Sequence, residues 1–141
     1  PSGVEIVGTH PLFGPQSARD GIAGRKIAVC AVHGRAAFRV AAFLRRMLGL
    51  DVILTTPEAH DREVAVVQGI THLIANVLIR MEPLPSRMTT ASFDLLVQAT
   101  GMVRYDARSV FLAIERHNPY AADVRQRFYA IADRLRRELE D

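Results

Sequence analysis

The chain of 141 residues lacks several features that mark particular classes of protein. It has a single cysteine, Cys30, so it forms no internal disulfide, and the apolar run around this residue favours a structural thiol in a reducing compartment. No apolar run approaches the length that a bilayer requires, and no basic segment followed by an apolar one opens the chain. We therefore expect a soluble, cytoplasmic protein without a membrane partner.

The sequence also has no block of basic residues, although its formal net charge is +3. Its arginines are scattered along segments of helical spacing and form no clustered basic face, so we expect no nucleic-acid partner. With 49% hydrophobic and 23% charged residues, the chain has the composition of a globular protein long enough to bury a core. A basic helical nucleic-acid binder is a further hypothesis, and it predicts salt-sensitive affinity for DNA.

A Gly-x-Gly-x-x-Gly phrase, which opens a dinucleotide-binding domain, is absent as well. Gly21 and Gly24 lie in a loop and have neither the spacing nor the preceding strand of that phrase. The sequence therefore contains no phosphate-binding turn of this type.

Hydrophobic patterning predicts an α/β segment over residues 1–56. Apolar runs predict strands over residues 4–7, 26–32 and 51–55, and helical spacing predicts a helix over residues 35–48. Runs that are apolar on both faces are typical of a parallel sheet covered on both sides. We expect the last strands of a Rossmann-like, doubly wound sheet with one helix, in which one sheet face lacks its helices.

Residues 57–141 are predicted to form a separate, all-helical domain. Thr56, Pro57 and Glu58 supply a cap, a proline at the first helical position and a first-turn acid, and Pro83 ends the helix after about residue 80. Its apolar residues surround most of the circumference, which predicts a buried helix. Three more helices are expected over residues 92–103, 107–117 and 120–140. Their loose apolar faces predict a domain completed by a second copy, which means a homodimer.

His10 is the first candidate for chemistry. An apolar strand precedes it, and the prolines and glycine of Thr9-His10-Pro11-Leu12-Phe13-Gly14-Pro15 are expected to turn the chain there. Ligands bind at that edge in open parallel sheets, and an imidazole with a pKa of about 6.5 exchanges protons near neutral pH. The alternative is a histidine that only hydrogen-bonds a turn.

A polar stripe on the long predicted helix is the second candidate. Asp61, Gln68, His72 and Asn76 are spaced by seven, four and four residues, so they lie within about 80 degrees of one another around the helix. Each buried polar group without a partner costs about 1 to 3 kcal/mol, so the stripe needs a partner or a ligand. Both an interhelical hydrogen-bond ladder at a subunit contact and a ligand site satisfy this requirement.

Several phrases together resemble the prephenate and arogenate dehydrogenases. Residues 9–15 resemble the family's THPxFGP signature, residues 58–61 and 68–72 resemble its EHD and QGxTH elements, and residues 118–120 are similar to its NPxxY. The matches occur in family order from about residue 4 to the end. The resemblance implies the carboxyl-terminal portion of such an enzyme, a fragment or one half of a split protein, without the Gly-rich half and inactive alone.

The resemblance also implies a reaction and its residues. In this family, prephenate or arogenate gives up a hydride to NAD or NADP and loses carbon dioxide as its ring becomes aromatic. His10 is then the catalytic base, we expect His10 and His72 to face one cavity, and no metal is expected. The expected substrate-binding residues are Gln16, Ser17, Gln68, His72 and Asp94, and the expected cofactor contacts are Thr9, Pro11 and Gly14. His60 and Asp61 are expected to shape the contact between the two domains.

Asp94 is a departure from the prephenate-type pattern. Many prephenate-type enzymes have an arginine after the aromatic residue that opens this helix, whereas here Phe93 is followed by an acid. Since a carboxylate does not pair with a carboxylate, Asp94 favours arogenate, which bears an ammonium group, over prephenate. An amino-substituted prephenate is also compatible with this residue. Alternatively, Asp94 is only a first-turn acid after Ser92.

An alternative function belongs to a different class. A non-catalytic helical module derived from this family, used for dimerisation or ligand sensing, would keep the substrate pocket without the nucleotide-binding half.

Overall fold

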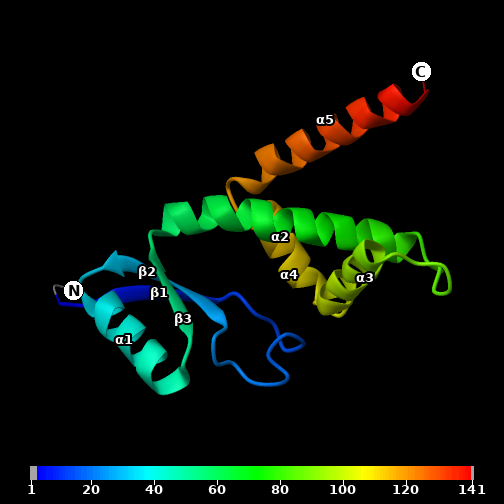
Figure 1. Ribbon diagram of the computed structural model, residues 1–141. Helices are drawn as coiled ribbons and strands as arrows, with labels where there is room; N and C mark the ends of the chain where they lie inside the picture. The colour runs from blue at the N-terminus through cyan, green and yellow to red at the C-terminus, as the bar shows by residue number, and fades with distance from the viewer. Residues whose placement is uncertain (1–2, 141) are drawn as a thin grey trace. The chain divides into compact units, whose positions relative to one another are not determined.

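The computed structural model describes residues 3–140 of the chain, which divides into two compact units, residues 1–60 and 61–141. The first unit contains the strands β1 (Ile6–Pro11), β2 (Lys26–His33) and β3 (Asp51–Thr55), the helix α1 (Ala36–Leu48) and the first turn of α2 (Pro57–Arg80). Figure 1 shows these elements in blue to green. The predicted strands at β2 and β3 and the predicted helix α1 are confirmed to within a few residues at their ends.

The three strands form one sheet in the order β1-β2-β3, in which β2 and β3 are parallel. Helix α1 connects these two strands and packs on the sheet. The core of this unit includes Ala37 and Ala41 of α1 together with Val29 and Val52 of the sheet. Gly49 ends α1 in the left-handed conformation at φ 63°, which glycine adopts without strain. The expected class, a remnant of an α/β sheet followed by a helical domain, is confirmed.

The direction and length of β1 differ from the expectation. β1 pairs antiparallel with β2 and extends through His10 and Pro11, which lie opposite Ala28 and Ile27. The missing N–H of Pro11 is tolerated because β1 is an edge strand among the described residues. The expectation that the strand ends at residue 7, with His10 at the carboxyl edge of a parallel sheet, is therefore wrong.

The second unit is helical, as predicted. It contains the rest of α2, then α3 (Ala91–Val103), α4 (Arg108–Leu112), a π-helical turn η1 (Ala113–His117) and α5 (Ala121–Glu140). The helix predicted over residues 107–117 is α4 continued by η1. Thr90 caps α3, because its hydroxyl accepts a hydrogen bond from the backbone N–H of Phe93 at 3.3 Å.

Helix α2 is buried on one side only. Its buried residues are Ala65, Gly69, His72, Leu73 and Ala75. In contrast, the side chain of Val67 is 66% exposed, so the prediction of a helix buried all round is wrong for the chain by itself. Among the described residues, α2 is also the one helix long and apolar enough to cross a bilayer, which corrects the expectation that no run approaches that length. Core helices of soluble proteins meet the same criterion.

Candidate functional site

His10 lies on the face of the sheet that α1 does not cover. Its cross-strand partner is Ala28, one residue before Val29, whose side chain packs on the α1 side. Successive side chains of a strand point to opposite faces, so His10 points away from α1. Thr9 and Pro11, the expected cofactor contacts, point to the α1 side. The structure therefore separates these two side chains from His10 by the thickness of the sheet.

The imidazole of His10 is hydrogen-bonded to a second imidazole. Its Nδ1 lies 2.8 Å from Nε2 of His60, and the two rings meet edge to face with their centroids 5.0 Å apart. Both side chains are half-buried. His60 was expected to shape the contact between the two domains, but the structure places its ring beside the candidate base. The sequence did contain a signal that His60 belongs to the site, because both histidines lie in phrases that carry the family resemblance.

His60 is held in place by the start of α2. Its backbone N–H donates to the carbonyl of Thr56 at 3.0 Å, and the hydroxyl of Thr56 accepts from the backbone N–H of Ala59 at 3.2 Å. The capping residue that predicted this helix start, Thr56, thus also positions the second imidazole.

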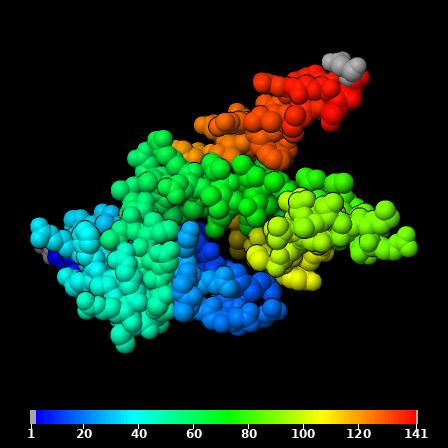
Figure 2. All heavy atoms as spheres, viewed as in Figure 1, coloured from blue at the N-terminus to red at the C-terminus, as the bar shows by residue number. Residues whose placement is uncertain are grey.

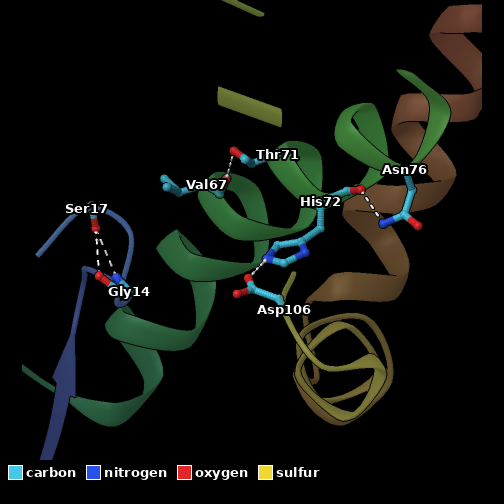
Figure 3. A network of polar contacts seen from close by, with 7 residues as sticks. All are labelled: Gly14, Ser17, Val67, Thr71, His72, Asn76 and Asp106. Carbon is cyan, nitrogen blue, oxygen red and sulfur yellow. Dashed lines mark hydrogen bonds and ion pairs between the residues drawn. The ribbon is translucent and has the colours of Figure 1, made fainter. Parts of the chain in front are cut away.

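The loop after β1 contains two expected substrate-binding residues, Gln16 and Ser17. Figure 3 shows the hydroxyl of Ser17 at Gly14, where it accepts from the backbone N–H at 3.0 Å and donates to the carbonyl at 3.1 Å. This hydroxyl closes its own turn, while Gln16 is exposed. The substrate contacts of both residues and the cofactor contact of Gly14 stay predictions.

His72 is the buried polar residue of α2 in the second unit. Its Nε2 lies 3.6 Å from Oδ2 of Asp106, as Figure 3 shows, and its ring is tilted against that of Phe111. A separation of 3.6 Å is too long for a hydrogen bond, so the contact is Coulombic. Burial lowers the pKa of His72, and the carboxylates of Asp106 and Glu115 offset part of this effect. Gln68 lies one turn earlier and is half-buried.

Glu115 is a buried acid that the sequence analysis did not identify. Its Oε2 accepts a hydrogen bond from Arg125 at 2.9 Å, and the same guanidinium donates to the Glu115 carbonyl at 2.7 Å. Its Oε1 is buried and has no hydrogen-bond partner among residues 3–140. An added Cβ at Gly69 would lie 3.5 Å from this oxygen, so the carboxylate packs against α2. The burial of Glu115 was not predictable from sequence, because a single acid within a predicted helix is usually exposed to solvent.

Asp94 occupies the first turn of α3. It is exposed, and its backbone N–H donates to the carbonyl of Thr90 at 3.0 Å. These contacts fit the alternative of an acid at a helix start, where the positive end of the helix dipole favours it. Its contact with substrate stays a prediction.

The phrase at residues 118–120 has a structural role. The side-chain amide of Asn118 donates to the carbonyl of Asp61 at 2.7 Å and accepts from the backbone N–H of Tyr120 at 2.9 Å. The guanidinium of Arg62 lies 4.9 Å from the centroid of the Tyr120 ring. These contacts fix the start of α5 against α2.

No family model matches the chain, but individual sequences do. It is 27% identical over 145 residues to arogenate dehydrogenase 2, chloroplastic, of Arabidopsis thaliana, a match that covers 99% of this chain and 40% of that protein. It is 25% identical over 138 residues to the probable arogenate/prephenate dehydrogenase of Methanocaldococcus jannaschii, covering 89% of this chain and 30% of that protein. The chain thus spans less than half the length of these relatives.

Solved structures give the same result for the fold. Prephenate dehydrogenase from A. aeolicus, in complex with hydroxyphenyl propionate and NAD+, matches 96% of this chain and 53% of its own, with a TM-score of 0.64 and 20% identity. Synechocystis arogenate dehydrogenase matches 99% of this chain and 54% of its own, with a TM-score of 0.62 and 16% identity. The resemblance found in the sequence is thereby confirmed: this chain is similar to the arogenate and prephenate dehydrogenases along nearly its whole length and has the fold of the carboxyl-terminal part of their structures.

Proposed function

We propose that this chain is the substrate-binding part of a dehydrogenase that acts on arogenate or prephenate and passes a hydride to NAD or NADP. The observation that carries the proposal is His10. It belongs to the phrase most similar to the family, and its Nδ1 is held 2.8 Å from a second imidazole. A histidine whose ring is fixed in this way is suited to act as a general base.

The chain's own part in this reaction is proton transfer and substrate binding. His10 takes the proton of the ring hydroxyl, and the carbinol carbon then becomes a carbonyl carbon as its hydride departs. The bond from the ring to its carboxylate breaks and carbon dioxide leaves. The electrons of that bond make the ring aromatic, and the carbonyl oxygen becomes a phenol oxygen as it takes a proton. The dinucleotide supplies the hydride acceptor when it is bound.

The described residues do not form a dinucleotide site by themselves. The loop between β1 and β2 has no Gly-rich phosphate-binding phrase, and the hydroxyl of Ser17 is used within its own turn. We infer that NAD or NADP is held mainly by residues outside this chain. This supports a division of the enzyme into a nucleotide-binding half and a second part that corresponds to this chain. Residues 57–141 then form the substrate-binding and dimerisation domain.

Arogenate is the substrate that the charges of the second unit favour. Two carboxylates, those of Asp106 and Glu115, act on His72, and they would attract the ammonium group of arogenate, whereas the keto group that prephenate has in its place carries no charge to attract. Three arginines could clamp a prephenate carboxylate: Arg80, Arg87 and Arg104. Arg104 is paired with Glu82 and Arg80 is hydrogen-bonded to Asn76, while Arg87 is exposed. We assign His72 and Gln68 to the substrate on this basis, and Asp94 to its amino group.

A homodimer is also part of the proposal. Large apolar side chains are exposed on α3 and along α5, the orange to red segment of Figure 2. Leu95 is 65% exposed and Leu135 is 53% exposed, which is unusual for leucines on amphipathic helices. A second copy of the chain would cover these faces. We place the enzyme in the cytoplasm, in keeping with its single cysteine.

The test uses the intact dehydrogenase that contains this chain. We expect hydride transfer with arogenate to exceed that with prephenate, measured as reduction of the nicotinamide. We expect His10→Asn to lower kcat by about two to four orders of magnitude with an unchanged Kd for the dinucleotide, because the base is lost and the cofactor site is not. His33→Asn, an exposed histidine at the end of β2, is the matched control. Activity with neither substrate would refute the enzyme and leave the non-catalytic helical module.

A further inference from the structure

The hydrogen bond between His10 and His60 restricts where their protons lie. Nδ1 of His10 and Nε2 of His60 are 2.8 Å apart, so one proton lies between them. If both facing nitrogens carried a proton, two donors would meet; if neither did, two lone pairs would. One ring donates and the other accepts, and the two choices assign different tautomers to His10.

The start of α2 favours His60 as the acceptor. His60 lies in the first turn of this helix, where the unpaired backbone N–H groups create a positive partial charge. That charge favours an imidazole that presents a lone pair. A His60 ring that accepts at Nε2 requires the proton to lie on Nδ1 of His10.

We propose that His60 is a positioning residue that accepts a hydrogen bond from Nδ1–H of His10 and so makes Nε2 of His10 the basic nitrogen. This inference rests on the proposed function only for its catalytic consequence, whereas the tautomer itself is a property of the chain. The hydroxyl proton of the substrate moves to Nε2 of His10. The imidazolium that forms keeps its Nδ1–H bond to His60.

The arrangement is the counterpart of the carboxylate that orients histidine in hydrolase triads. A neutral imidazole replaces the carboxylate, so the partner fixes the ring and its tautomer without adding a negative charge. His10 therefore gives up its acquired proton more readily than it would beside a carboxylate. Because the capped first turn of α2 holds His60, the orienting group is built on a rigid element.

A direct test reads the tautomer in the 141-residue chain. Long-range 1H–15N NMR spectra of the histidine side chains, recorded where the imidazoles are neutral, distinguish a protonated Nδ1 from a protonated Nε2. For His10 in the wild type we expect a protonated Nδ1 and an unprotonated Nε2. In His60→Phe, which keeps an aromatic ring but removes the accepting lone pair, we expect a shift toward the tautomer protonated at Nε2. A wild-type spectrum that shows an unprotonated Nδ1 on His10 overturns the inference, whether or not any variant folds.

Kinetics of the intact dehydrogenase test the consequence. We expect His60→Phe to lower kcat about tenfold, which corresponds to the loss of one orienting hydrogen bond, while KM for the substrate stays the same. His60→Gln, whose side-chain oxygen accepts in place of Nε2, should restore most of kcat. His33→Phe should leave kcat unchanged. Full activity in His60→Phe would overturn the positioning role, whereas an inactive wild type with the expected NMR tautomer would refute only the proposed function.

Discussion

The buried imidazole of His72 lies 3.6 Å from the carboxylate of Asp106 in the helical unit. The side chain of His72 is 7% exposed and that of Asp106 is 34% exposed, so the acid faces water while the base does not. Burial wins over the Coulombic attraction, and the pKa of His72 is lowered from its ordinary value. Burial thus favours the neutral form of this imidazole, which can both donate a hydrogen bond to a polar ligand and accept one from it.

Asp106→Asn should lower the pKa of His72 further, because it removes the larger of the two carboxylate effects that oppose burial. An NMR titration of the His72 ring measures this shift. Asp94→Asn is the control, because it removes the same charge at an exposed position, and it should leave the pKa of His72 unchanged. A higher pKa of His72 in Asp106→Asn would contradict the electrostatic account.

The same lowered pKa makes the stability of the chain depend on pH. Between the folded and the unfolded pKa of His72, the unfolded state binds more protons, so the contribution of His72 to the free energy of unfolding falls as the pH decreases through this window. Denaturant titrations at a series of pH values should show a larger fall in Asp106→Asn than in the wild type, because its window extends to lower pH. An equal fall in both proteins would show that Asp106 does not act on His72.

Gly34→Ala should destabilise the chain by about 1 to 2 kcal/mol, because Gly34 has φ +83° and a side chain is strained in this conformation. An added Cβ would also lie 2.6 Å from Glu5, whose carboxylate accepts from the backbone N–H of Arg35 at 2.6 Å and pairs with Arg39. These bonds, that of Arg35 above all, hold the pKa of Glu5 below its usual value.

Chemical denaturation measures this effect. Gly14→Ala is the control, since nothing lies within 4 Å of an added Cβ there and its φ is not in the left-handed region. Equal stability of Gly34→Ala and the wild type would mean that Glu5 and the turn relax freely.

Leu135→Glu should weaken self-association of the chain at least tenfold, because it places a charge on the apolar face of α5 that the proposed dimer buries. Sedimentation velocity over a range of concentrations measures the change. Gln126→Glu introduces the same charge on the opposite side of α5 and should leave association intact. A wild-type chain that is monomeric at all concentrations, or a Leu135→Glu dimer as tight as the wild type, would refute this interface.

Much of the local structure was predictable from sequence. Thr56 and Pro57 mark the start of α2, Gly49 marks the end of α1, and the boundaries of β2 and β3 follow from their apolar runs. These features depend on dihedral preferences and capping bonds within a few residues, which is why sequence alone determines them. The family phrases likewise identified His10 and His72 as candidates.

Tertiary structure alone decided which side chains meet. The direction of β1 was not predictable, because an apolar or alternating run of residues is compatible with both parallel and antiparallel pairing. The pair of His10 and His60 joins residues 50 positions apart, and the contact of His72 with Asp106 joins α2 to the loop between α3 and α4. Such contacts depend on how elements pack, so the sequence determined the candidate groups and the fold determined their partners.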